Sequence, residues 1–103
     1  MSNKFQELQD RIVGWRNTNL PESTLTGTLK HLLEEVKDLQ KNPYDPDSLA
    51  DVFILMMAVC DEVGYTLDDV AIAIEAKQAI NESRHWGKAD SEGIIRHIKE
   101  TKF

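Results

Sequence analysis

The fold is decided by residues 49–60, LADVFILMMAVC. Asp51 is the one charged residue of this run, and a lone carboxylate in so apolar a segment is costly unless a partner or a cation compensates it. The run is too short to span a bilayer, and it is apolar on nearly all sides, as expected of a helix covered from several directions. A chain of 103 residues does not easily bury such a helix by itself. We therefore expect part of it to lie in the interface of a homo-oligomer, a dimer or a tetramer.

Apolar residues recur with helical spacing along the chain, and no segment is typical of a strand or a repeat. We predict helices over about residues 3–17, 25–40, 46–62 and 67–85, with a short last helix over residues 91–99. The expected caps are Ser23 or Thr24, Asp45 followed by Pro46, Gly64, and the box-like segment Thr66 to Asp69. The predicted fold is thus an all-α bundle of four to five helices in a single domain, residues 1–103.

Composition excludes several classes of protein. The net charge of −6 and the pI near 4.9 argue against a nucleic-acid binder, although a nucleotide substrate remains open because a bound cation reverses the local field. The first residues lack the apolar core of a signal peptide, so we expect a cytoplasmic protein with no membrane partner.

The cysteine and histidine residues exclude a disulfide and several kinds of metal site. Cys60 is the one cysteine, which leaves no internal disulfide and no thiolate zinc site. His31 stands four residues before Glu35 and forms neither the zinc-protease motif nor the paired Glu-x-x-His motifs of di-iron bundles. His31 is therefore expected at the surface or beside a ligand rather than as a ligand.

The candidate metal site is a set of carboxylates on two successive helices. Glu35 and Asp38 are three residues apart and share a helix face, which Glu34 borders. Because the connection to the next helix is short, the two helices should be antiparallel, with Asp51 facing this pair and Asp47 nearer the loop. Oxygen ligands of this kind suit Mg²⁺, for which Mn²⁺ is a substitute. The alternative for the first helix alone is an ordinary solvated face.

A second candidate feature is the polar stripe on the predicted helix 67–85. Lys77, Asn81 and Arg84 recur at helical spacing, followed by Trp86, and such a stripe could hold a polyphosphate. The alternative is a solvated face, with Trp86 as a packing anchor rather than a nucleotide contact. Trp15 is a further candidate for the border of a base pocket, although tryptophan at such a position is more often part of a core.

Together these segments resemble the MazG-like all-α nucleoside triphosphate pyrophosphohydrolases. The resemblance rests on EVKD at 35–38, SLADVFIL at 48–55, the His-x-x-Glu-Glu segment at 31–35, and a Lys-x₃-Asn-x₂-Arg-x-Trp-Gly segment at 77–87. It covers roughly residues 25–98. Within that superfamily the segments are most similar to the small phage and bacterial dATP/dGTP diphosphohydrolases, the MazZ-like group.

The resemblance implies Mg²⁺-dependent hydrolysis of purine deoxynucleoside triphosphates to the monophosphate and pyrophosphate, in the cytoplasm of a bacterial or phage-infected host cell. It also implies that Glu35, Asp38 and Asp51 are the catalytic, metal-binding carboxylates, with Glu34 or Asp47 as further ligands. Lys77, Asn81 and Arg84 match the positions that contact phosphate in the family.

This chain departs from the family pattern at two positions. Asp38 stands in place of a glutamate, and Ser48 begins the second motif where the family has glutamate. A hydroxyl is a much poorer Mg²⁺ ligand than a carboxylate. Ser48 is the best argument for an alternative function, a catalytically weak module that binds nucleotide or a partner protein. A house-cleaning enzyme for pyrimidine or modified nucleotides and a plain helical interaction protein also stay open.

Overall fold

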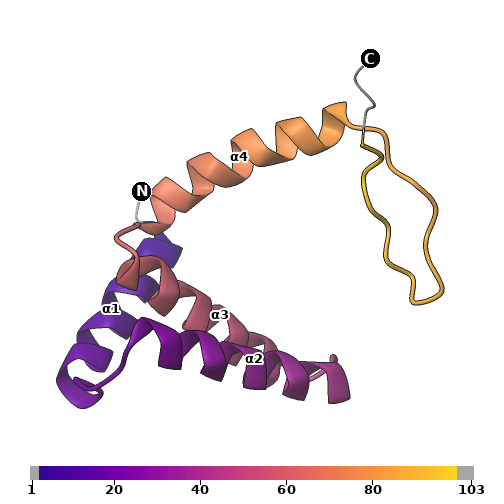
Figure 1. The fold of residues 1–103 in the computed structure, drawn as a ribbon. Coiled ribbons are helices and arrows are strands. Elements are labelled where there is room, and N and C mark those ends of the chain that lie inside the picture. Colours follow the sequence, from indigo (N-terminus) through magenta and orange to yellow (C-terminus); the bar gives the residue numbers. More distant parts are fainter. Residues whose placement is uncertain (1–2, 100–103) are drawn as a thin grey trace. The chain divides into compact units, whose positions relative to one another are not determined.

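The computed structural model describes residues 3–99, and in this range the chain is all-α, as predicted. Its helices are α1 (Lys4–Asn19), α2 (Leu25–Lys41), α3 (Pro46–Glu62) and α4 (Leu67–Ser83), all labelled in Figure 1. The chain divides into two compact units, Met1–Val70 and Ala71–Phe103, and each is described by itself. Among the described residues, no helix is both long and apolar enough to cross a membrane.

The predicted caps at the starts of α2 and α3 are confirmed. Thr24, rather than Ser23, caps α2, and its hydroxyl accepts a hydrogen bond from the Gly27 amide at 3.0 Å. Asp45 caps α3, where Pro46 occupies the first turn. Each cap satisfies an amide that the helix itself cannot bond, so these ends are determined by local sequence.

The turn between α3 and α4 also follows the prediction. Gly64 adopts a φ of 91°, a left-handed conformation that glycine enters without strain, and α3 ends just before it. Thr66 and Asp69 then form a reciprocal capping box: the Thr66 amide donates to the Asp69 carboxylate at 3.0 Å, and the Asp69 amide donates to the Thr66 hydroxyl at 3.1 Å. Aspartate therefore replaces the usual glutamate of this motif without loss of either bond.

Helices α2 and α3 pack along their length and form the centre of the first unit (Figure 1). They are antiparallel, since the Thr28 hydroxyl near the start of α2 donates to Glu62 at the end of α3, at 2.8 Å. Positions of low exposure recur with helical spacing on both helices: Thr28, Leu32, Glu35 and Leu39 on α2, and Ser48, Val52, Leu55 and Val59 on α3. These two stripes are the seam between the helices.

Helix α1 packs against α3 on another side and places one polar side chain inside. Gln9 is only 3 % exposed, and its amide nitrogen donates to the carbonyls of Met57 and Tyr65, both at 3.2 Å. Its amide oxygen accepts the backbone N–H of Leu67 at 3.2 Å and the Gln6 amide at 2.8 Å. Gln9 thus joins α1 to the end of α3 and the start of α4.

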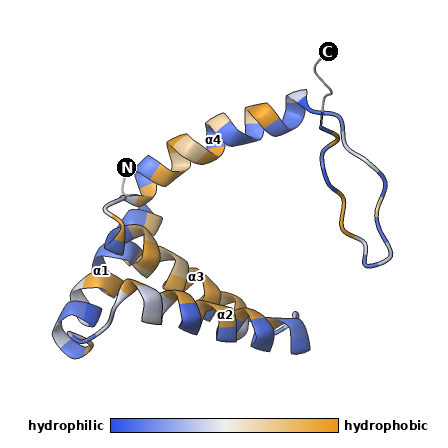
Figure 2. Ribbon diagram, viewed as in Figure 1, coloured by the Kyte–Doolittle hydropathy of each residue, from blue (hydrophilic) through white to orange (hydrophobic). Residues whose placement is uncertain are grey.

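One face of α3 is exposed within the first unit. Figure 2 shows α3 as the most continuously apolar helix of the first unit, and Leu49, Phe53 and Met56 are between 42 % and 57 % exposed on it. These three residues share one helical face, which neither α1 nor α2 covers. The predicted subunit interface stays a prediction, and this face is where it would lie.

The predicted last helix, residues 91–99, is wrong. This segment instead folds back on the residues that follow α4. The Gly87 amide donates to the Arg96 carbonyl at 2.9 Å, and the Ile98 amide donates to the His85 backbone carbonyl at 2.7 Å. Gly93, with a φ of 83°, provides the left-handed residue of the turn. Helix α4 also ends at Ser83, two residues earlier than predicted.

Asp90 organises this C-terminal turn. Its carboxylate accepts hydrogen bonds from the Arg96 guanidinium at 2.7 Å and from the backbone amides of Glu92 and Ile94 at 2.9 and 3.0 Å. Arg96 above all, and then these amides, hold the pKa of Asp90 below its ordinary value. The pattern of apolar residues in 91–99 is therefore a poor guide, because turn chemistry decides the conformation.

Candidate functional site

Glu35 is the carboxylate that lies between the packed helices. Its side chain is 19 % exposed, and it occupies the seam of α2 that faces α3. The other predicted carboxylates, Glu34, Asp38, Asp47 and Asp51, are exposed. Glu35 is therefore the candidate ligand that the fold holds most firmly.

The expectation that Asp51 is a buried, costly charge is wrong for the isolated chain. Asp51 is exposed, whereas the buried residues of α3 are Leu55, Met57 and Ala58. The reason is that α1 and α2 cover only part of the circumference of α3. An apolar run identifies a helix that needs covering, but it does not tell which of its sides one chain covers.

The predicted metal ligands have suitable chemistry but are not gathered at one point. Carboxylate oxygens on two antiparallel neighbouring helices are the donors that Mg²⁺ and Mn²⁺ take. Within residues 3–99, however, no three acidic, histidine or cysteine side chains are arranged closely enough to hold an ion. The metal site therefore stays a prediction that rests on the donor types and on the α2–α3 pairing.

Two neighbours of this region have defined contacts. The His31 ring lies 3.2 Å from a Glu35 carboxylate oxygen, one helical turn away on α2, which agrees with the prediction of a residue beside a ligand. Ser48, which stands where the family has glutamate, donates its hydroxyl to the Asp45 carboxylate at 3.3 Å. The Ser48 hydroxyl is therefore used at the N-terminal cap of α3.

The predicted phosphate-contacting residues lie in the second unit. Lys77 is exposed on α4, while Asn81 and Arg84 are half-buried near its end. The Trp86 indole donates to the Asn81 carbonyl at 2.9 Å, so Trp86 is anchored to α4. Arg84 lines a cavity of about 410 Å³ whose other basic side chains are His85, His97 and Lys99. The positive charges of Arg84 and Lys99 suit an anion.

Trp15 lies in an apolar groove rather than at a polar pocket. It is 58 % exposed, and it shares a groove of about 560 Å³ between α1 and α3 with Phe5 and Phe53. Trp15 is therefore not part of a core in this structure, and its place at the border of a base pocket stays a prediction.

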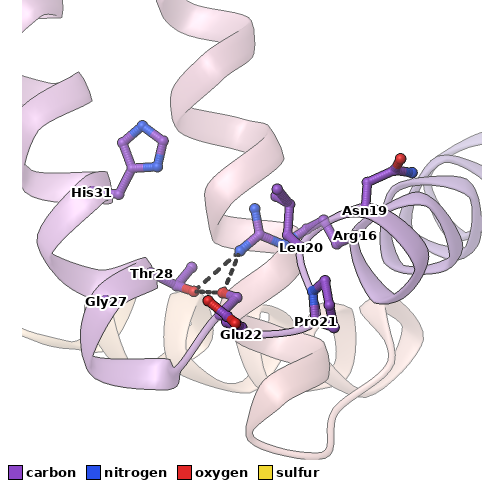
Figure 3. A pocket seen from close by; sticks show the side chains of 9 residues that line it. Arg16, Asn19, Leu20, Pro21, Glu22, Gly27, Thr28 and His31 are labelled. Carbon is purple, nitrogen blue, oxygen red and sulfur yellow. Dashed lines mark hydrogen bonds between the residues drawn. The ribbon is translucent and has the colours of Figure 1, made fainter.

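Sequence reasoning missed a cavity of about 540 Å³ at the corner where α1 passes into α2 (Figure 3). It is lined by residues of the end of α1, the connecting loop and the first turns of α2: Arg16, Asn19, Leu20, Pro21, Glu22, Ser23, Gly27, Thr28 and His31. One sequence signal pointed toward it. Thr28, His31 and Glu35 share a face of α2, so the polar stripe that contains Glu35 extends toward the start of that helix.

The floor of this cavity is a network of polar contacts between three helices. The Arg16 guanidinium donates to the Ser23 hydroxyl at 3.0 Å and to Thr28, which is 2 % exposed, at 3.2 Å. Thr28 in turn donates to Glu62, and Arg16 lies 3.8 Å from the same Glu62 oxygen. Figure 3 shows Arg16 reaching across the corner to Thr28. Arg16, Ser23, Thr28 and Glu62 thus form a connected set, called the corner network below.

Comparisons with known proteins bear on this arrangement. The family model of dATP/dGTP pyrophosphohydrolases matches residues 8–102. The dATP/dGTP diphosphohydrolase of Cyanophage S-2L is 40 % identical over 94 residues, which is 89 % of this chain and 86 % of the relative. A dATP/dGTP diphosphohydrolase of Salmonella phage PMBT28 is 31 % identical over 93 residues, and the match spans 89 % of this chain but 31 % of that longer protein.

A solved structure is similar as well. The MazG-like pyrophosphohydrolase of Cyanophage S-2L, bound to dGDP and three catalytic Mn²⁺ ions per active site, aligns with a TM-score of 0.78 and 37 % sequence identity. The alignment covers 92 % of this chain and 93 % of that one.

Proposed function

The chain belongs to the dATP/dGTP pyrophosphohydrolase family, and we propose that it hydrolyses dATP and dGTP to the monophosphate and pyrophosphate with Mg²⁺ as its cofactor. The observation that carries the proposal is the position of Glu35. Glu35 lies in the seam of two packed helices and in the motif that resembles the family's first metal-binding motif. A charged carboxylate at such a poorly solvated position is costly, and a bound cation would offset that cost.

The proposed ligands are Glu35 and Asp38 on α2 and Asp51 on α3, with Glu34 and Asp47 as further donors. Their oxygen chemistry fits a hard divalent ion, and Mn²⁺, the ion bound by the cyanophage relative, is expected to replace Mg²⁺. A divalent cation held there would neutralise the triphosphate and lower the pKa of an attacking water. His31 supports Glu35 from one turn away, because its ring keeps that carboxylate oriented along α2.

The second unit would supply the contacts to phosphate. Lys77, Asn81 and Arg84 are the proposed residues, with Arg84 able to donate two parallel hydrogen bonds to phosphate oxygens. The hydrogen bond from the Trp86 indole to the Asn81 carbonyl ties the segment just after α4, which contains Arg84, to the end of that helix. We also propose a cytoplasmic location, where dNTPs are found.

Incubation of the purified protein with each dNTP and NTP and Mg²⁺ is expected to release pyrophosphate from dATP and dGTP. The assay should measure pyrophosphate and orthophosphate separately, because the two products distinguish cleavage of the bond between the α- and β-phosphates from removal of the terminal phosphate. Chelation of the metal with EDTA should stop turnover, and Mn²⁺ should restore it. Orthophosphate as the sole primary product would contradict the reaction type, and preferred turnover of dCTP or dTTP would favour the house-cleaning alternative.

We further propose that the chain works as a homo-oligomer through the exposed face Leu49, Phe53 and Met56. Burial of three such side chains stabilises an association by several kcal/mol at about 25 cal/mol per Å². The wild-type protein is expected to sediment above its monomer mass of 11.7 kDa at micromolar concentration, and Phe53→Lys is expected to shift it toward the monomer. Tyr44→Lys, at an exposed loop position, is the matched control. A wild-type protein that sediments as a monomer would exclude this interface.

A further inference from the structure

We propose that Asp90 and Arg96 are positioning residues for Arg84, because their ion pair closes the loop after α4 and so holds residues 97–99 beside the Arg84 side chain. The inference rests on the proposed function, in which Arg84 contacts phosphate. It goes beyond that function, since Asp90 and Arg96 act through Arg84 and not on the substrate. All of these residues lie in the second unit.

The loop after α4 is closed by backbone hydrogen bonds at both of its ends. Close to the helix, the Ile98 amide donates to the His85 carbonyl at 2.7 Å. At the far end, the Asp90 amide donates to the Ile94 carbonyl at 2.9 Å. The chain before the turn and the chain after it therefore run antiparallel, as the two arms of one loop (Figure 1). Residues 94–99 are called the returning arm below.

Asp90 uses both carboxylate oxygens to close the far end of this loop. One oxygen accepts hydrogen bonds from the Glu92 and Ile94 amides, and the other accepts one from the Arg96 guanidinium. The first two bonds form the turn, whereas the third joins the turn to the returning arm. The Asp90 side chain is 37 % exposed and that of Arg96 66 %, so their ion pair adds little to the stability of the whole chain. Its effect is on the local geometry of the returning arm.

A second contact joins the returning arm to the backbone around Arg84. His97, which follows Arg96, packs edge-on against the Trp86 ring with the ring centroids 5.9 Å apart. The Asn81 carbonyl accepts both the Trp86 indole N–H at 2.9 Å and the Arg84 amide at 3.2 Å. Arg84 lies one residue beyond the last residue of α4. Its backbone is therefore held by the same carbonyl that anchors Trp86 and, through Trp86, the returning arm.

The returning arm also confines the Arg84 side chain. Arg84 shares a cavity of about 410 Å³ with three residues of that arm, His97, Ile98 and Lys99. Arg84 is half-buried, whereas Lys77 on α4 is exposed. Of the described residues that line this cavity none is acidic, so no carboxylate of the lining competes with phosphate for the guanidinium. An arginine that is already confined loses less rotamer entropy when it binds, and release of the returning arm would add that cost back.

The decisive variant is Asp90→Asn, tested with inorganic pyrophosphate as the probe and no metal present. Asparagine keeps an oxygen for the Glu92 and Ile94 amides and loses the charge that holds Arg96. The affinity is read from the Arg84 Nε–H resonance in ¹⁵N NMR spectra of the full chain. Asp90→Asn is expected to weaken pyrophosphate binding by about fivefold, the scale of one arginine side chain that must be ordered on binding.

The sign of this effect distinguishes positioning from simple electrostatics. Loss of an acidic residue makes the protein less negative, which by itself strengthens the binding of an anion. Glu92→Gln is the matched control, because it removes one carboxylate from the same turn while its backbone amide can still donate to Asp90. Glu92→Gln should therefore bind pyrophosphate at least as tightly as the wild type.

Kinetics with dGTP and Mg²⁺ provide the second readout. Asp90→Asn should raise KM by about fivefold and change kcat by less than about twofold, because this contact to phosphate is equal in the ground and transition states. In an Arg84→Ala background, Asp90→Asn should have no further effect on KM, a result that general loosening of the fold would not produce. Arg96→Gln should add little to Asp90→Asn, since the two residues act as one pair. Circular dichroism would verify that each variant keeps its helices.

The outcomes separate this inference from the proposed function. If the protein hydrolyses dGTP but Asp90→Asn binds pyrophosphate as tightly as Glu92→Gln does, the positioning role is wrong and the function stands. If no nucleotide is hydrolysed but Asp90→Asn weakens pyrophosphate binding at Arg84, the proposed function is wrong and the positioning role stands. An effect of Asp90→Asn that persists in full in the Arg84→Ala background would overturn the inference, as would a wild-type Arg84 resonance that pyrophosphate leaves unchanged.

Discussion

Glu35→Gln is expected to lower kcat/KM for dGTP by about a thousandfold while the helical content of the protein is preserved. Glutamine keeps the size of the side chain and removes its charge. Because Glu35 lies in the seam between α2 and α3, no mobile neighbour can easily replace it there. A loss of about 4 kcal/mol of transition-state stabilisation corresponds to this change in rate.

The measurement compares initial rates over a range of Mg²⁺ concentrations. Asp51→Asn, which removes the proposed ligand on α3, should abolish metal-dependent turnover in the same way. Asp61→Asn is the matched control, since Asp61 is an exposed carboxylate at the other end of α3 and should have wild-type activity. Normal turnover by Glu35→Gln would remove the main support for the site, and normal turnover by Asp51→Asn would show that α3 contributes no charged ligand through that residue.

The second large effect concerns stability rather than catalysis. Gln9→Leu is expected to lower the free energy of unfolding by about 3 kcal/mol, because the carbonyls of Met57 and Tyr65 both lose the buried amide that donates to them, while the Leu67 amide keeps its hydrogen bond to Gln6. Leucine has similar volume and favours a helix, so packing and propensity change little. For a domain of this size the melting temperature should fall by roughly 15 °C.

Thermal denaturation followed by circular dichroism would measure this shift. Gln40→Leu, an exposed glutamine on α2, controls for the general effect of a leucine in place of a glutamine and should change the melting temperature by no more than a few degrees. A Gln9→Leu protein that melts with the wild type would mean that water satisfies these groups as well as Gln9 does.

The sequence was a good guide where a structural decision is local. Thr24, Asp45 with Pro46, and the Thr66–Asp69 box each cap a helix through atoms within three residues, so pattern and chemistry coincide. Gly64 ended α3 for the same reason. The antiparallel order of α2 and α3 followed from the shortness of their connection.

The sequence was a poor guide where partners are far apart along the chain. Gln9 bonds to atoms 48 and 56 residues away, and Thr28 bonds to Glu62, 34 residues away. Such distant pairs leave no periodic pattern of polar residues in the sequence. Asp51 was misjudged for a related reason, since exposure depends on which sides of α3 its neighbours cover. The turn around Asp90 replaced a predicted helix because side-chain and glycine geometry overrode a weak apolar pattern.

The corner network has a consequence for which residues around this cavity can change among relatives. Arg16 and Thr28 join three helices, so a substitution at either would be selected against through folding before its effect on ligand choice could matter. Asn19 and His31 lie on the rim and make only short-range contacts within their own helices. Evolution, or a laboratory library, can therefore vary Asn19 and His31 at little risk to the scaffold, whereas Arg16 and Thr28 are expected to change rarely.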